Sequence, residues 1–231
     1  MPVGHCRFCD AGLREGGRDC YVGNMPSPAG HLLAGAAIAW AAESFGPLRA
    51  RAEDHVGRAP TASAMTPLVL ACAALALAPD VDILLASHRT YTHSIGAAGL
   101  AALAGGVVAR ALGAPGVATG LTCGLVVASH ILLDWLGRDG STPRGLMALW
   151  PLSAAYFYSG IDLFADISRR YWKPDEFIFR NAVSIAREIV ILAPAAGLAF
   201  WIRQRRSGKG DRLQRRRATS ESRAPSPESR T

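Results

Sequence analysis

Net charge is missing from most of this sequence. The chain of 231 residues carries 25 Lys/Arg and 18 Asp/Glu, a formal charge of +7. Residues 203–231 hold ten Lys/Arg and three Asp/Glu, an excess of seven that accounts for the whole formal charge. The first 202 residues are therefore neutral as a group, and they lack the basic surface expected of a nucleic-acid-binding domain. We expect no specific nucleic acid as a partner.

A disulfide framework and a secretory signal are also missing. Of the five cysteines, Cys72 and Cys123 lie inside apolar runs and the other three lie in a polar leader, which is not the pattern of a disulfide-stabilised domain. Residues 1–24 contain no apolar stretch, so they are neither a secretory signal nor a packed element, and we predict a disordered leader. One interpretation is that translation begins at Met25; a small zinc knuckle in the leader is the alternative.

What the sequence does contain is a large apolar fraction. Half of its residues are hydrophobic, and its mean hydropathy is positive, which is high for a soluble chain with so many arginines. Several of its apolar segments approach the roughly 20 residues that a helix needs to span a bilayer. There are five such segments, at about His31 to Ser44, Thr66 to Ala86, Ser94 to Gly113, Pro115 to Leu136 and Asn181 to Ile202.

These segments are rich in Ala and Gly, which suits close helix packing in lipid. We therefore predict an all-α integral membrane bundle of about four to five helices within residues 25–202. A soluble Ala-rich helical bundle is the alternative.

Two polar stretches border the predicted helices. The loop from Gly137 to Arg180 is long and contains the run LWPLSAAYFYSG, so we predict that it caps one end of the bundle; its aromatics would also suit a membrane interface. From Arg203 onward the chain is basic and then rich in Ser, Pro and Glu. We predict a disordered basic tail over residues 203–231.

Ionisable groups at the ends of membrane helices are costly, so each one marks a candidate functional site. Consecutive spanning helices alternate in direction, and the candidates in this chain occur at alternating helix ends, which places all of them on one side of the membrane. On the opposite side the sequence shows only Arg110. The candidate metal ligands are His31, Asp80, Asp82, His88, His93, His130 and Asp134.

Local spacing agrees with a shared site. His130 and Asp134 are four residues apart and so share a helix face, and Asp80 and Asp82 flank one residue just after a proline, where a distorted helix could aim both carboxylates inward. Imidazole and carboxylate together favour Zn, Mn or Fe over Ca. More than four candidate ligands suggest two metals, and we allow for one to three divalent ions, with zinc as the first choice and manganese as the alternative.

Two further residues are candidates for catalysis. Arg89 lies among the ligands and could clamp an anionic group through its planar fork; it could equally pair with Asp80 or Asp82. Glu188, about two turns into the fifth predicted helix, could act as a ligand or a general base, or Arg187 could simply neutralise it.

Structural explanations stay open for other polar residues. His31 could cap its helix, and Ser94 is better explained as a helix N-cap than as a nucleophile. Asp139, Asp162 and Asp166 are predicted to be solvated loop charges.

Several separated motifs together resemble a known family. SPAGHLLAG, PDVD, HRTYTHS, SHILLDW and LWP, in this order and spacing, resemble the YdjM-like, LexA-regulated, membrane-bound metal-dependent hydrolases, from about Met25 to Ile202. That family looks distantly similar to zinc-dependent phospholipase C and the single-strand-specific nucleases. The resemblance implies that the seven candidate ligands carry over as metal ligands.

We therefore expect a membrane-bound metal-dependent hydrolase of phosphoester bonds, in which metal-activated water attacks a lipid or lipid-linked substrate. The expected partners are membrane lipid and a small-molecule or lipid phosphoester. A metal-handling or transport protein is one alternative, and a scaffold with a structural metal is another. We expect an inner-membrane, multi-pass protein. The positive-inside rule places the tail in the cytoplasm and the metal site on the outer side, although the cap also carries six basic residues. The sequence leaves the oligomeric state open.

Overall fold

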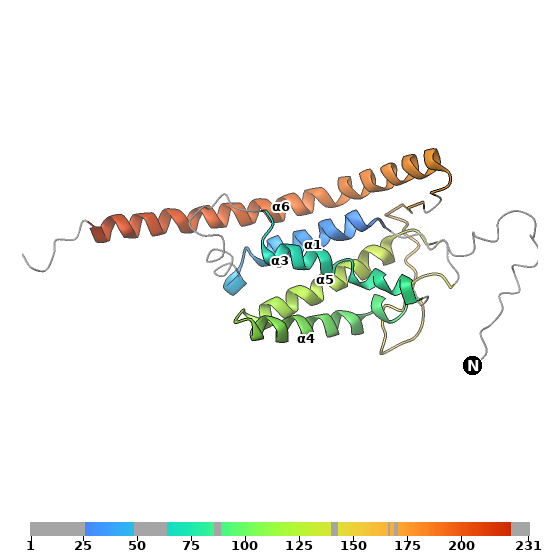
Figure 1. Cartoon of the computed structure of the whole chain (residues 1–231), viewed down its shortest axis with the longest axis horizontal. Coiled ribbons are helices and arrows are strands. Elements are labelled where there is room, and N and C mark those ends of the chain that lie inside the picture. Colours follow the sequence, from blue (N-terminus) through green and yellow to red (C-terminus); the bar gives the residue numbers. More distant parts are fainter. Residues whose placement is uncertain are drawn as a thin grey trace, which may run out of the picture.

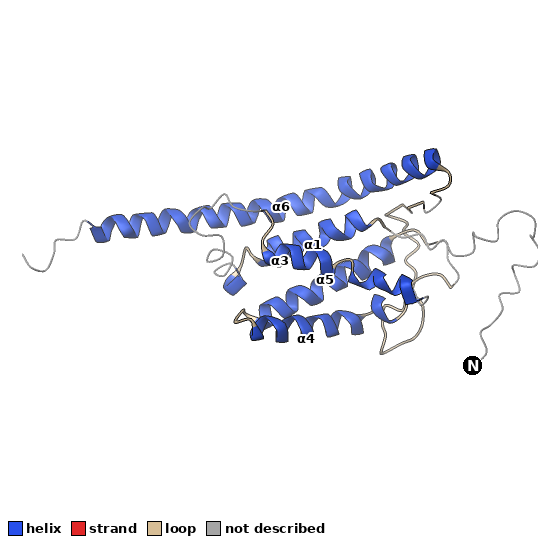
Figure 2. Ribbon diagram, viewed as in Figure 1, coloured by secondary structure: helices blue, strands red, loops and turns tan. Residues whose placement is uncertain are grey.

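Helices make up all of the regular secondary structure in the described part of the chain (Figure 2). The computed structural model describes residues 26–48, 64–85, 89–139, 143–165, 167–168 and 171–222, without the side chains of 83–85 and 207–222. The all-α prediction is confirmed. The elements are α1 (Pro28–Ala42), α3 (Pro67–Leu75), the 3₁₀ helices η2 (Ala78–Leu85) and η3 (Tyr91–His93), α4 (Ile95–Ala111), α5 (Gly116–Leu136) and α6 (Pro174–Ser222).

Two of these helices are long and apolar enough to cross a membrane. They are α5 over Gly116–Leu136, with 21 residues, and the Pro174–Arg206 part of α6, with 33 residues. The apolar helices α1 and α4 are shorter. Length and composition thus fit a membrane protein.

The second predicted helix is divided in two. Proline lacks a backbone N–H, and its ring clashes with the carbonyl four residues earlier; for Pro79 that carbonyl belongs to Leu75, which is the last residue of α3. The chain then continues as η2, which carries Asp80 and Asp82. The predicted single helix from Thr66 to Ala86 is therefore wrong, but the predicted distortion at the proline is present, as a change from α-helix to 3₁₀ helix before the two aspartates.

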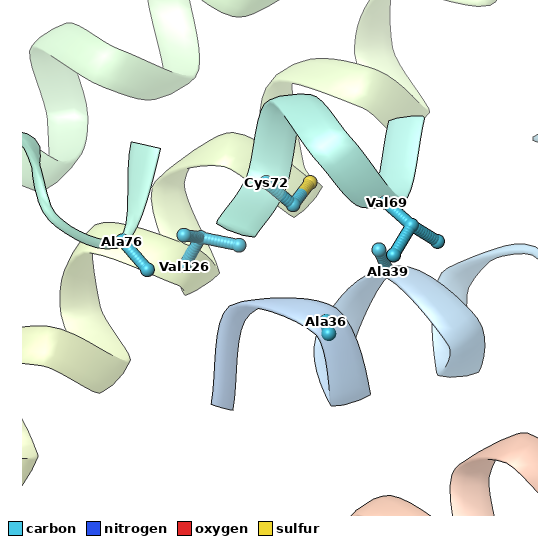
Figure 3. Close-up of a cluster of buried hydrophobic side chains, with 6 residues drawn as sticks. All are labelled: Ala36, Ala39, Val69, Cys72, Ala76 and Val126. Atoms are coloured by element: carbon cyan, nitrogen blue, oxygen red, sulfur yellow. The ribbon is translucent and has the colours of Figure 1, made fainter. Parts of the chain in front are cut away.

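Small residues bring the helices close together. A Cβ on Gly120 of α5 would lie 2.5 Å from the carbonyl oxygen of Ala102 in α4, and one on Gly35 of α1 would lie 2.7 Å from the carbonyl oxygen of Cys72 in α3. A buried cluster of mostly small side chains from α1, α3 and α5 fills the space between these three helices (Figure 3). The close packing predicted from the Ala and Gly content is present.

Helices α1 and α6 lie side by side and run in the same direction (Figure 1). Near the start of α1, the backbone N–H of Ser27 donates to Glu188 of α6 at 2.6 Å, and these residues are 161 apart in sequence. At the other end, Glu43 pairs with Arg203 at 2.8 Å. The two contacts hold the two helices at both ends of α1.

The Glu43–Arg203 ion pair, at the end of the bundle far from the cap, and the length of α6 each correct one expectation. Arg203 and Glu43 are 7% and 4% exposed, and Thr66 donates a hydrogen bond to the same carboxylate, so Arg110 is not alone among polar residues at that end. Helix α6 also begins at Pro174 and continues through Ser222, so the structure has helix where we predicted a disordered tail from Arg203. Glu188 consequently lies about four turns into the helix, not two.

The segment between α5 and α6 lies over the right-hand end of the bundle in Figure 1. Backbone N–H groups of Ile95 and Gly96, at the start of α4, donate to Ala148 and Trp150 of this segment at 2.8 and 2.9 Å. These bonds agree with the predicted cap, which the structure describes at residues 137–139, 143–165, 167–168 and 171–173. Its last predicted residues, 174–180, instead form the first two turns of α6.

Candidate metal centre

Four side chains from three elements meet at the capped end of the bundle. Each of them offers one ligand atom, and these four atoms lie within 4.8 Å of one another. Two imidazoles and two carboxylates form a donor set suited to a transition-metal ion or zinc. The four residues are Asp80 from η2, His93 from η3, and His130 and Asp134 from α5.

The imidazole of His130 is oriented by the end of α3. Its Nδ1 lies 2.7 Å from the carbonyl oxygen of Ala76, the C-cap residue, which is available because the last carbonyls of a helix have no partner within it. A carbonyl only accepts hydrogen bonds, so Nδ1 carries the proton. In the neutral imidazole the other nitrogen, Nε2, then offers a lone pair, and it lies 3.3 Å from Asp134 Oδ2 one turn along α5.

The imidazole of His93 is held in the same manner by Asp82. Its Nδ1 lies 3.2 Å from Asp82 Oδ2, and Thr92 donates to the same oxygen at 2.5 Å. The opposite ring nitrogen, Nε2, lies 3.1 Å from Asp134 Oδ2 and 3.6 Å from Asp80 Oδ1. The structure therefore places the predicted ligand Asp82 behind the His93 ring, where it supports the ligand set from outside.

His31 lies against this group of four. Its ring stacks on that of His130 with centroids 4.0 Å apart, and its Nε2 lies 3.3 Å from Asp134 Oδ1. It is 1% exposed. His31 therefore points into the cluster, and the capping alternative is wrong: the N-cap residue of α1 is Ser27.

The polar atoms at the centre show whether these residues fit a cation. Both ring nitrogens of His31, both carboxylate oxygens of Asp134 and Oδ1 of Asp80 are buried without a hydrogen-bond partner, although ion-pair distances of 3.1 to 3.6 Å separate them from neighbouring groups. Nε2 of His93 and Nε2 of His130 face each other at 3.1 Å. Buried polar atoms left unpaired are costly. A divalent cation among them would satisfy these donors, so the residues fit a metal.

The protonation of His93 fits the same conclusion. Burial opposes the charged imidazole, yet hydrogen bonds to Asp134, Asp80 and Asp82 outweigh it and raise the pKa of His93 well above its usual range. Carboxylates that favour a proton on this ring favour a metal ion there for the same electrostatic reason.

Glu188 lies close to the centre but is engaged with α1. Both the backbone N–H and the hydroxyl of Ser27 donate to its carboxylate, and it is 0% exposed. A Cβ on Gly30 would lie 2.6 Å from its Oε2, so the glycine leaves room for the carboxylate. Arg187 donates instead to the carbonyl of Asp162, so it does not neutralise Glu188.

Arg89 pairs with Asp139 of the cap. Asp139 is 6% exposed and also accepts from the backbone N–H of Gly145 at 2.5 Å, so the prediction of a solvated loop charge is wrong for this residue. Arg89 has a positive φ of 66°, and its carbonyl accepts from Met147 at 3.1 Å. The ion pair and this bond join the segment before His93 to the cap.

The remaining candidates have simpler outcomes. Ser94 is the N-cap of α4 and accepts from the backbone N–H of Ala97 at 3.2 Å, as predicted. Asp162 accepts from the Tyr158 hydroxyl at 2.6 Å and is partly buried. His88 and Asp166 lie outside the described residues.

Ser27 is the functional neighbour that sequence reasoning missed. A serine directly before the proline that opens a helix is a recognisable N-cap signal. Its partner, however, is 161 residues away, and no local spacing indicates it.

Comparison with known families covers most of the chain. Residues 25–206 match a family model described as YdjM inner membrane protein, which agrees with the resemblance found from the motifs. No curated protein and no solved structure shows a significant match. The description names a membrane location and no activity, so hydrolysis stays a prediction.

Proposed function

Because this chain belongs to the YdjM inner membrane protein family, we propose that its His/Asp cluster is the metal centre of a membrane-bound hydrolase. The proposed reaction is hydrolysis of phosphoester bonds in a lipid or lipid-linked substrate. Zinc is the proposed ion and manganese the alternative. We further propose that the protein is multi-pass, with the α6 extension in the cytoplasm and the metal centre on the outer side.

The observation that carries this proposal is the set of unpartnered donor atoms at the cluster. His31, Asp80 and Asp134 all contribute buried atoms that have no hydrogen-bond partner. Glu43 Oε2 at the far end is also buried without a hydrogen-bond partner, but the guanidinium of Arg203 lies 2.8 Å from it. The atoms of the cluster instead face imidazoles and carboxylates, so a cation would complete their pairing. Their convergence at a helix-end layer, where lipid headgroups lie, supports a site for chemistry on a headgroup.

A bound divalent cation would lower the pKa of a coordinated water toward about 7 and stabilise charge on a phosphoryl oxygen. The protein's own contribution is orientation. Ala76 and Asp82 fix the two imidazoles so that both Nε2 atoms face the same point, and such outer partners typically change metal affinity or activity by about 10- to 100-fold.

Glu188 and Arg89 remain the proposed catalytic residues, although each is already bonded to another residue of the protein. Glu188 lies near enough to His31 to act on its charge, but its bonds to Ser27 make it first a residue that positions α1. Arg89 is neutralised by Asp139, so an anionic substrate would have to compete with that carboxylate for its guanidinium.

A structural metal is the second candidate, and a specific observation favours it. His93 and His130 are both 0% exposed, as expected of a closed site in which the protein supplies every ligand. Such a scaffold would bind metal and lose stability without it, but would have no turnover to lose.

The test uses the full chain purified in detergent. Metal content is measured by mass spectrometry, and hydrolysis is measured on bis-p-nitrophenyl phosphate and on dispersed phospholipid, before and after chelation. We expect stoichiometric metal and a turnover that disappears on chelation and in His130→Ala, while Arg110→Ala, at the far end of α4, leaves both unchanged. A folded preparation without metal would overturn the proposal; bound metal with no turnover would favour the scaffold.

The orientation proposal has its own test. Topology reporters fused to the C-terminus, one active only in the cytoplasm and one active only outside it, should give signal from the cytoplasmic reporter alone. The reverse result would place the metal centre on the cytoplasmic side.

A further inference from the structure

The metal cluster is closed on most sides by the protein and is accessible at one ligand. The side chains of His93, His130 and Asp134 are 0%, 0% and 1% exposed, whereas that of Asp80 is 18% exposed. Among the four clustered ligands, a molecule from outside can therefore reach the centre only along the Asp80 side.

The described residues beside Asp80 are apolar and exposed. A 3₁₀ helix has three residues per turn, so with Asp80 and Asp82 both directed at His93, the residue between them faces outward. That residue is Val81, which is 57% exposed. Tyr91 of η3 is also 57% exposed, and its ring packs edge-on against Trp150 of the cap with centroids 5.2 Å apart.

This apolar rim is continuous with an outer face of the bundle. Two residues after His93, α4 begins with Ile95, which is 44% exposed. Leu103 and Val107 are 66% and 61% exposed and are four residues apart, so they are neighbours on the helix surface. At 3.6 residues per turn they lie about 80° and 120° around the helix from Ile95. Helix α4 lies at the edge of the bundle in Figure 1. An exposed apolar stripe thus winds around α4 from the entrance of the site toward the other end of the helix.

A surface of this kind in an inner membrane protein faces acyl chains, because exposed apolar side chains are stable there without a protein partner. Resting on the proposed function, we propose that the substrate is a membrane lipid that reaches the centre sideways from the bilayer. Its acyl chain lies along the α4 stripe, and its polar headgroup passes between Val81 and Tyr91 to Asp80. Val81 and Tyr91 then select amphiphilic over water-soluble phosphoesters.

The first experiment detects contact with lipid and does not depend on catalytic activity. A benzophenone amino acid replaces Tyr91 in the full chain, which is reconstituted into phosphatidylethanolamine–phosphatidylglycerol vesicles, irradiated and analysed for lipid adducts by mass spectrometry. The same group at Leu103 marks the lipid-facing stripe. We expect adducts at both positions; an adduct at Leu103 with none at Tyr91 overturns the proposal.

The second experiment measures selectivity between a lipid substrate and a water-soluble one. Val81→Ser should lower turnover of dispersed phospholipid by about tenfold, the factor expected when a small apolar contact is lost, while turnover of bis-p-nitrophenyl phosphate and metal content stay as in the wild type. Val117→Ser makes the same change at the far end of the bundle, where Val117 is 81% exposed, and should affect neither substrate. Equal losses on both substrates in Val81→Ser would overturn the proposal.

The two proposals fail in different ways. If the wild type hydrolyses neither substrate, the hydrolase proposal fails, and the adduct at Tyr91 still decides whether lipid reaches the rim. If the wild type hydrolyses the soluble substrate but Tyr91 forms no adduct, the hydrolase proposal stands and the lipid entrance is wrong.

Discussion

The two ends of the bundle bury polar side chains in different ways. At the far end, the carboxylate of Glu43 receives both the guanidinium of Arg203 and the hydroxyl of Thr66. At the capped end, donor atoms of His31 and Asp134 approach one another without forming hydrogen bonds. At the far end the protein supplies the cation itself, in Arg203, whereas at the capped end it brings together four ligand atoms that could hold a metal ion.

This difference distinguishes buried polar groups that stabilise the fold from buried polar groups that could bind a ligand. Buried charges are tolerated when they are paired, and a buried pair mainly determines how elements fit together. Buried polar atoms that remain unpaired need an explanation such as a missing ion. The far pair also bears on the transport alternative, because an ion crossing the bundle would meet a carboxylate that is already neutralised by Arg203.

The largest expected effect comes from removing a central imidazole. His130→Ala deletes a ligand and leaves the Ala76 carbonyl without its donor, so we expect complete loss of bound metal at micromolar concentrations, measured by mass spectrometry after gel filtration. Thr66→Val, at the far end, is the matched control and should retain its metal. Normal metal content in His130→Ala would show that the four-residue group is not the binding site.

Breaking the far ion pair should be costly for stability and neutral for metal. Arg203→Met leaves Glu43 buried without its partner, a change that typically costs about 3 to 5 kcal/mol, and we expect a clear drop in the unfolding temperature in detergent. Restoring complementarity with Glu43→Leu in the same chain should recover most of the loss. If Arg203→Met instead released metal, the two ends would not be independent.

Asp82→Asn tests the role of the carboxylate behind His93. Asparagine can still accept from His93 Nδ1 but carries no charge, and we expect metal affinity to fall by about 10- to 100-fold, measured by competition with a chelating dye. Thr92→Val removes the hydroxyl that bonds Asp82 and should have a smaller effect. A complete loss in Asp82→Asn, equal to that of His130→Ala, would make Asp82 a direct ligand.

The smallest effect is expected at Glu188. Glutamine can still accept from the Ser27 N–H, so Glu188→Gln should keep near-normal stability. Glu188→Ala leaves the two buried donors of Ser27 without their acceptor and should cost about 1 to 3 kcal/mol. Thermal unfolding in detergent distinguishes the two variants. If Glu188→Gln abolishes hydrolysis while its stability and metal content are normal, Glu188 is the general base.

The sequence predicts those parts of the site in which residue spacing along a helix decides which side chains lie together. The i, i+4 spacing of His130 and Asp134 and the alternation of helix ends predicted a shared site, and the proline before Asp80 indicated the local distortion. Those inferences need only helix geometry and the direction of each span.

Contacts between distant residues could not be predicted in this way. The orientation of the His93 ring decides whether Asp82 is a ligand or a support, and no spacing specifies it. The Arg89–Asp139 and Glu43–Arg203 pairs join elements whose relative placement depends on the packing of the whole bundle. The basic residues that follow Arg203 in sequence predict a disordered tail there, because nothing local indicates that Arg203 pairs with Glu43, just after α1.

Helices α1 and α6 are also held in a fixed register relative to each other. Ser27 meets Glu188 and Glu43 meets Arg203, so the sequence offset between the helices is nearly the same at both contacts. One residue inserted into α6 between Glu188 and Arg203 would shift everything beyond it by about 1.5 Å and rotate it by about 100°. Only one of the two contacts could then form, and the length of α6 between them is therefore constrained even where its side chains face outward.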